Sequence, residues 1–356
     1  MRPFRSIFRK GNFLIIFLLI ASSAYCYGQF DQRYTVTHYT DENGLSQNSV
    51  NGIAEDKEGF IWLTTESGLV RFDGQNFHTF DKSNSNLTTI RFNAIYPDLS
   101  GTGHKIFASN DSFEFMSIQG PNVVRDTVAS IALFNRIGYE KQDFYPYLQS
   151  VVISTSSQKA FIKDLEMTFP LRYIMLAPSH AGTYYFVDHE RITFFRQWKK
   201  VYAFSYKRPK LQDLFTLGDK LYCFGDDGKV RLIDPDKEES VRLTGDILTD
   251  ADYDPNKRNF IGYWNNISDQ CFILLKKKLY FLNAQSDGAL DTKLVLDGFD
   301  FTSHSIENVH YNPKQKRLFL GSATHGLFIF NPKNFRALVV SRKNQENLLK
   351  HLTNVI

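Results

Sequence analysis

DKEGFIWLTTESGLVRFD, residues 56–73, contains the clearest structural signal in this sequence. Lys57–Gly59 has the composition of a turn, an apolar segment around Trp62 follows, and a second turn ends at Gly68. Glycine adopts the positive φ that such a tight turn needs. After it, residues 69–72 alternate between two faces, as the side chains of a strand do. The stretch therefore predicts two short antiparallel strands joined by a tight turn.

The same pattern recurs along the chain. The clearest further copy is residues 312–331, where Phe319 stands in the place of Trp62 and Gly326 in that of Gly68. Looser copies keep only the shape of the unit, and they lie at residues 105–115, 184–194, 221–232, 271–281 and around 150–162. These units, spaced by roughly 45 residues, match the repeats that form the blades of β-propellers.

We therefore predict an all-β fold, a seven-bladed β-propeller with four-stranded antiparallel blades. No amphipathic helices of about 10–15 residues separate the strands, which disfavours an alternating α/β fold. Two stacked β-sandwiches would share the composition but would not explain the repeat. A propeller must join its last blade to its first. The strand-like segment Tyr34–Tyr39 is expected to do so, at the outer edge of the blade formed by residues 303–338.

Composition and charge agree with an exported β-protein. The 32 Phe and 18 Tyr favour strands. The chain has 42 Lys and Arg against 38 Asp and Glu, but the four extra cations all precede residue 11. The remaining sequence is balanced in charge and gives no electrostatic footprint for nucleic acid, which is excluded as a partner.

Residues 1–28 have the order of a secretory signal peptide: cations, an apolar run at 13–20, then small residues. Cleavage is expected before Gln29. A lipoprotein signal at Cys26 is the weaker alternative, because bulky Tyr25 precedes it. An uncleaved anchor is the other alternative, but the run is shorter than the roughly 20 residues of a membrane-spanning helix. The mature protein is thus expected in the periplasm, without a membrane span.

Two cysteines, Cys223 and Cys271, follow the signal peptide, and they are too few for a disulfide scaffold. We expect two unpaired thiols on separate strands, with a disulfide between them as the alternative. No Cys/His spacing indicates a metal site, and no cofactor is expected.

Residues 44–53, GLSQNSVNGI, together with residues 56–72 resemble the two-component regulator propeller repeat. The copy at 312–331 is similar to it in part. The resemblance implies the periplasmic sensor region of a large hybrid sensor kinase. Such a region recognises an extracellular ligand, often an oligosaccharide, and signals through a membrane helix to a histidine kinase. It implies a propeller that is not itself an enzyme.

This sequence departs from that family because it contains one propeller and no kinase. We expect a signal peptide at 1–28, a propeller sensor domain at 29–340, and a tail at 341–356. The tail repeats features of residues 45–50, which indicates the start of a further propeller; a short amphipathic helix is the alternative. We therefore expect the N-terminal part of a longer sensor that contacts a neighbouring propeller or a dimer partner, with a short orphan sensor as the alternative.

Candidate ligand-binding residues are aromatic or cationic side chains in polar, loop-like settings. Sugar rings stack on exposed aromatic faces, and amides hydrogen-bond to their hydroxyls. Trp264 with Asn265, and Trp198 between Gln197 and Lys199, have this composition. Arg91 is suited to pair with a uronate or sulfate group. Trp62, in contrast, is expected to pack between blades.

No motif of a nucleophilic or metal-dependent enzyme is present in the sequence. The leading prediction is thus a non-catalytic propeller that senses an oligosaccharide or another small extracellular ligand. Two alternatives stay open. One is a structural or protein-interaction propeller without its own ligand, and the other is a propeller lyase with catalytic His and Glu on its central loops.

Overall fold

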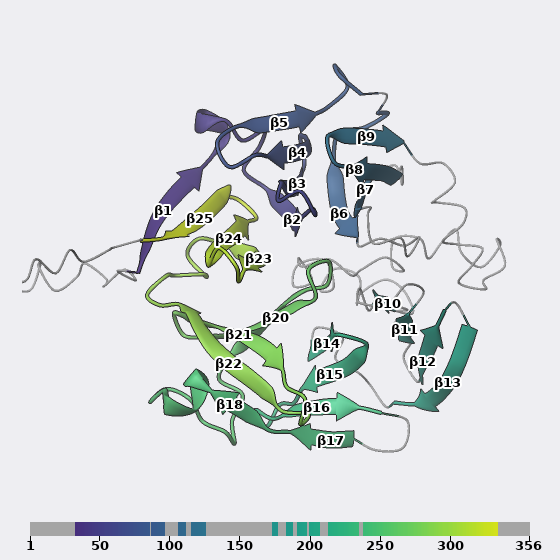
Figure 1. The fold of residues 1–356 in the computed structure, drawn as a ribbon, viewed down its shortest axis with the longest axis vertical. Helices are drawn as coiled ribbons and strands as arrows, with labels where there is room; N and C mark the ends of the chain where they lie inside the picture. Colours follow the sequence, from purple (N-terminus) through teal and green to yellow (C-terminus); the bar gives the residue numbers. More distant parts are fainter. Residues whose placement is uncertain are drawn as a thin grey trace, which may run out of the picture.

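The computed structural model describes residues 33–85, 87–96, 106–111, 115–125, 173–176, 183–187, 191–197, 199–206, 213–234 and 238–333. These residues form six β-sheets that follow one another around a common centre (Figure 1). The predicted signal peptide, the unit around 150–162 and the tail at 341–356 lie outside the described residues.

Three sheets belong to the two ends of the described chain. Sheet A contains, in order, β1 (Tyr34–Tyr39), β25 (Leu327–Pro332), β24 (Arg317–Ser322) and β23 (Ile306–Asn312). Sheet B contains β2 (Val50–Glu55), β3 (Ile61–Thr65), β4 (Gly68–Phe72) and β5 (Phe77–Phe80). Sheet C contains β6 (Phe92–Tyr96), β7 (Ile106–Asn110), β8 (Phe115–Gln119) and β9 (Asn122–Arg125).

The other three sheets lie between residues 173 and 296. Sheet D contains β10 (Tyr173–Leu176), β11 (Tyr184–Val187), β12 (Arg191–Arg196) and β13 (Lys199–Ser205). Sheet E contains β14 (Leu214–Leu217), β15 (Lys220–Phe224), β16 (Val230–Ile233) and β17 (Glu238–Val241). Sheet F contains β18 (Leu243–Gly245), β22 (Leu290–Leu296), β21 (Lys278–Ala284), β20 (Gln270–Leu275) and β19 (Ile261–Asn265).

The all-β class with four-stranded antiparallel sheets is confirmed. Sheet F departs from it with a fifth strand, β18, which pairs in parallel with β22. Two short 3-10 helices, η1 (Asp41–Asn43) and η3 (Asp246–Thr249), connect strands. No helix within the described ranges is both long and apolar enough to cross a membrane.

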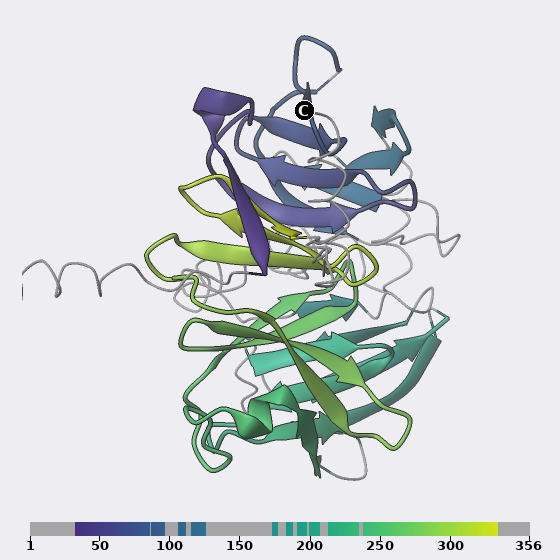
Figure 2. The same ribbon diagram turned by 60° about the vertical axis from the view of Figure 1, so that its left-hand side comes forward.

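β1 pairs antiparallel with β25, from Tyr34 opposite Pro332 to Tyr39 opposite Leu327. The first strand of the described chain is therefore the edge strand of the sheet that holds its last strands. Figure 2 shows β1 on the outer side of this sheet.

The hairpin of β3 and β4 forms for the reasons that its sequence indicates. Gly68 has a φ of 131°, and a Cβ at this position would lie 2.6 Å from the Thr79 side chain, so no other residue fits without strain. Trp62 is fully buried, and its indole Nε1 donates a hydrogen bond to Asp56 Oδ2 at 2.8 Å. Trp62 belongs to a cluster of buried side chains that also contains Phe92 and Ile95 of β6, in agreement with the prediction that it packs between blades.

The hydrophobic core lies between neighbouring sheets. Separate clusters of buried side chains join sheet B to C, A to B, and F to A, and a larger cluster joins D, E and F. The innermost strands also touch: β6 contacts β2, β2 contacts β23, β23 contacts β19, and β14 contacts both β20 and β10. The sheets are thus adjacent in the order C, B, A, F, E, D. Neither Cys223 nor Cys271 forms a disulfide, as expected.

Candidate ligand-binding site

A cluster of polar side chains lies near the common centre of the described sheets, where three sheets meet. Glu55 ends β2, His310 and Asn312 lie in β23, and Ser268 lies in the turn between β19 and β20. His310 Nε2 is 2.9 Å from Glu55 Oε2, and His310 Nδ1 is 2.9 Å from Ser268 Oγ. Asn312 Nδ2 donates to both oxygens of Glu55, at 2.8 and 3.1 Å.

The hydrogen bonds of this cluster determine the charge of Glu55. Its burial works to raise the pKa, because a carboxylate loses hydration there. The hydrogen bonds from His310 and Asn312 and the positive charge of Arg317 act in the opposite direction and prevail, so the pKa of Glu55 lies below its ordinary value. Glu55 is therefore ionised at neutral pH and holds the ends of two inner strands together.

Asn265 completes this central cluster, which we define as Glu55, Asn265, Ser268, His310 and Asn312. Its Nδ2 donates to the carbonyl oxygen of Ile53 at 3.2 Å and to that of Val309 at 3.0 Å, and its Oδ1 accepts a bond from the Ser268 amide at 3.2 Å. One fully buried amide thus connects sheets F, A and B.

Two more amides join inner strands in the same way. Asn308 Nδ2 donates to the carbonyl oxygen of Val50 at 2.7 Å. Gln270 Nε2 donates to the carbonyl oxygen of Tyr311 at 2.6 Å, and the Tyr311 amide donates back to Gln270 Oε1 at 3.0 Å. The sequence does not single out Asn308 or Gln270 as residues that join strands. Each is an amide residue next to apolar strand residues, and that pattern is common in surface strands as well.

The loop setting expected for Trp264 and Asn265 is wrong, because both residues lie in β19 and are buried. Trp264 Nε1 donates to the carbonyl oxygen of Thr216 in sheet E at 2.9 Å. The polar atoms of Trp264 and Asn265 hydrogen-bond to backbone carbonyl oxygens of neighbouring inner strands. The polar composition of this segment therefore reflects contacts between sheets and not a loop. Trp264 exposes no ring face for stacking, and a role of either residue in ligand binding stays a prediction.

Arg91 is not brought together with this cluster. Arg91 is exposed just before β6, and its guanidinium forms an ion pair with Glu66 at 3.3 Å. Its position on the surface is compatible with the predicted pairing to an anion. Trp198 lies outside the described residues.

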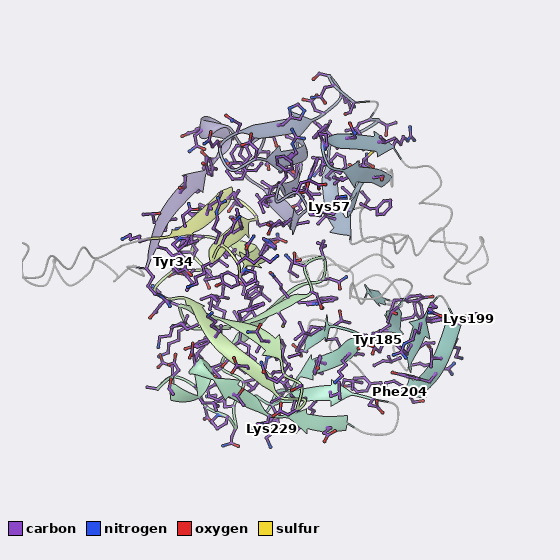
Figure 3. All side chains as sticks on the ribbon, in the orientation of Figure 1. Tyr34, Lys57, Tyr185, Lys199, Phe204 and Lys229 are labelled. Carbon is purple, nitrogen blue, oxygen red and sulfur yellow. The ribbon has the colours of Figure 1, made fainter. Side chains whose placement is uncertain are left out.

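A cavity of about 790 Å³ lies between sheets F and A. Its lining contains five cationic side chains: Arg33, Lys293, Lys314, Lys316 and Lys333. We call this cavity and its lining the basic groove. Tyr34, Leu294, Tyr311, Gln315 and Pro332 complete the lining. Figure 3 labels Tyr34 at this place, where β1 and β25 approach β22.

A second, smaller cavity of about 360 Å³ lies between sheets E and F. Asp219 and Asp269 line it, and both carboxylate oxygens of Asp269 accept the Gly218 amide, at 2.8 and 3.0 Å. Within the described part of the chain, no group of three or more His, Cys, Asp or Glu residues could hold a metal ion.

Comparison with protein families finds one match. Residues 44–67 match the model of the two component regulator propeller, which confirms the resemblance of this repeat. The matched residues include β2 and β3, and end in the turn before β4. A comparison with curated proteins finds no match.

Several solved structures are similar in fold to this chain at low identity. One is the extracellular domain assigned to a hybrid two-component system of B. thetaiotaomicron, with 15% identity, a TM-score of 0.41, and 83% of this chain and 42% of that chain covered. Another is PorZ, a surface component of the type-IX secretion system of Porphyromonas gingivalis, with 8% identity, a TM-score of 0.47, and 85% and 40% covered. A gluconolactonase of Xanthomonas campestris has 9% identity, a TM-score of 0.41, and 85% and 91% covered. The chain thus spans well under half the length of the first two proteins.

Proposed function

We propose that this chain is a non-catalytic propeller that senses a small extracellular ligand, an oligosaccharide, as part of a two-component regulator. The observation that carries the proposal is the two-component regulator propeller repeat at residues 44–67, which forms β2, β3 and the turns around them. Ligand binding would change how the propeller contacts its neighbour, and a shift between two arrangements would pass to a kinase.

The proposal includes a closed ring of seven blades. Six sheets adjacent in the order C, B, A, F, E, D support it, as does the pairing of β1 with β25. The sequence between β9 and β10 is about one repeat long and contains the seventh predicted unit. In a closed ring, β1 would join the two ends of the chain within one blade.

The proposal also includes export and a larger assembly. The order of cations, apolar run and small residues in 1–28 supports a cleaved signal peptide and a periplasmic location. The balanced charge after residue 28 supports a partner other than nucleic acid. A neighbouring propeller or a dimer partner would receive the signal.

Thermal unfolding of the purified chain with neutral and acidic oligosaccharides tests ligand sensing. A ligand that binds only the folded state stabilises it by about 2.7 kcal/mol at 100 times its Kd, and the effect saturates with concentration. A saturable rise in Tm with one class of sugar is expected. If no sugar raises the Tm of a cooperatively unfolding chain, the propeller has no sugar site of its own. The alternative of a structural or protein-interaction propeller without its own ligand then replaces this proposal.

A hydrolase is the second candidate function, because Ser268, His310 and Glu55 have the order hydroxyl, imidazole and carboxylate of a hydrolytic triad. In that function His310 Nδ1 would accept the Ser268 proton as the oxygen attacks an ester or lactone carbonyl, and Glu55 would stabilise the imidazolium. Turnover of aryl esters or sugar lactones that is lost in Ser268→Ala would favour it. Equal rates in both proteins would remove it.

A further inference from the structure

We propose that the basic groove binds an anionic oligosaccharide through its sulfate or carboxylate groups. This inference rests on the ligand sensing proposed above and assigns that ligand a chemical class and a place. The groove lies between two sheets, so a ligand bound there would contact both.

The first argument is charge. The five cations come from four separate segments of the chain: Arg33, Lys293 in β22, the turn with Lys314 and Lys316, and Lys333. Among the described residues that line the groove, none is acidic. The sequence after residue 28 has equal numbers of cationic and acidic residues, so the excess of cations in the groove is local and not a property of the whole chain. Cations gathered in one concave site repel one another and attract anions to it.

The second argument is size and shape. A cavity of about 790 Å³ falls within the range of roughly 300–1,000 Å³ that is typical of small-molecule sites. Among its lining residues, Tyr34 and Tyr311 are buried and Leu294 is half-buried, whereas the lysines are exposed. The pKa of Tyr311 is raised by its burial, and the charge of Arg33 acts against this rise, so the Arg33 charge reaches Tyr311. A lining of buried rings and exposed cations suits a small polyanion.

The third argument comes from the turn between β23 and β24. Lys316 has a φ of 55°, a conformation that glycine adopts at much lower cost than lysine. The corresponding turn of sheet B has Gly59 at this position, with a φ of 89°. Lys316 therefore places a cation in the groove at a position where the corresponding turn of sheet B uses glycine.

The fourth argument concerns the kind of anion. Lysine ammonium groups act as separate point charges on flexible stems, and they suit several anionic groups spaced along a ligand. The amide of Gln315, also in the lining, is able to hydrogen-bond to hydroxyl groups. A sugar with repeated sulfates or uronates offers both features. A single phosphate or carboxylate would engage only part of the groove.

Calorimetric titration of the full purified chain tests the proposal. Five probes are used: sucrose octasulfate, a tetragalacturonate, unmodified sucrose as the neutral control, and a short oligonucleotide and an acidic peptide as anions that are not sugars. The test variant combines Lys293→Gln, Lys314→Gln and Lys316→Gln. The matched control combines Lys57→Gln, Lys199→Gln and Lys229→Gln, three lysines on other sheets or their turns (Figure 3). Far-ultraviolet circular dichroism and Tm confirm that both variants are folded.

We expect one or both anionic sugars to bind the wild-type chain and the control variant alike, and sucrose not to bind. Each lost charge-assisted hydrogen bond weakens binding about tenfold, so the groove variant should bind at least about 100-fold more weakly. Equal binding by the groove and control variants overturns the groove as the site but leaves ligand sensing intact. Binding of neutral sugars alone overturns the anionic class and also leaves sensing intact. Groove-dependent binding of an oligonucleotide or an acidic peptide, with no sugar bound, overturns the oligosaccharide.

Discussion

The central cluster includes Asn312 at the end of β23, and the basic groove includes Lys314 and Lys316 in the turn that follows, but the two regions treat polar groups in opposite ways. In the cluster, both oxygens of Glu55 and both ring nitrogens of His310 have partners within the protein. In the groove, exposed cations line a cavity without a carboxylate in its described lining. The first arrangement stabilises the contacts between sheets, and the second offers charge to a ligand. The two regions should therefore respond to substitution in opposite ways.

The largest effect on stability is expected for Asn265→Ala in the central cluster. The substitution leaves the buried carbonyl oxygens of Ile53 and Val309 without this partner, and also the half-buried amide of Ser268. Each buried unsatisfied group costs about 1–3 kcal/mol, so the two carbonyl oxygens give an expected loss of about 2–6 kcal/mol in the free energy of unfolding. Urea unfolding measures it, with the exposed Asn256→Ala as a control. A loss equal to that of the control would mean that Asn265 does not join the sheets.

Glu55→Gln is expected to cost about 1–3 kcal/mol at neutral pH, because it removes an ionised acceptor of three hydrogen bonds. The pKa of Glu55 is lowered in the folded protein, so its contribution is complete above its ordinary pKa of 4.5 and is lost as pH falls through the lower folded value. The difference between wild type and variant should therefore shrink below pH 4.5. Unfolding curves at several pH values measure it, and a difference independent of pH would contradict this role of the carboxylate.

Arg91→Ala is expected to change stability by at most about 1 kcal/mol, because its ion pair with Glu66 is exposed to solvent. Urea unfolding at low and high salt measures the change. If Arg91 also contacts an anionic ligand, as the sequence predicts, titration will show weaker binding in a fully stable variant. Unchanged affinity would remove Arg91 from the candidate residues.

The smallest effect on stability per substituted residue is expected for the triple groove variant at Lys293, Lys314 and Lys316. These side chains are exposed, so the free energy of unfolding should change by no more than about 0.5 kcal/mol per site, while affinity for anions falls. Differential scanning calorimetry without ligand measures this. A loss comparable to that of Asn265→Ala would show that the groove lysines are structural, and the contrast between the two regions would fail.

Local features of the fold could be predicted from the sequence. The β3–β4 hairpin follows from Gly68 and the alternation after it, and the burial of Trp62 follows from its apolar neighbours. The setting of Trp264 and Asn265 could not be predicted, because their hydrogen-bond partners lie on strands far away in the sequence. A polar residue on an inner strand and one on a loop have the same local composition.

The basic groove could not be predicted either. Arg33 and Lys333 lie near the two ends of the described chain and meet only because β1 pairs with β25. Lys293 reaches the same cavity from another sheet. No local pattern marks these residues as neighbours, because the cavity exists only after the sheets are arranged.

The pairing of β1 with β25 also has a mechanical consequence. The Lys333 amide donates to the carbonyl oxygen of Arg33 at 2.8 Å, so the described chain enters and leaves at one corner. Tension that pulls these two ends apart would load the antiparallel pair one hydrogen bond at a time, starting at the bond between Lys333 and Arg33, which is a weak geometry under force. Arg33 and Lys333 also line the groove. An anion bound to both would therefore link the two ends and increase the force needed to separate β1 from β25.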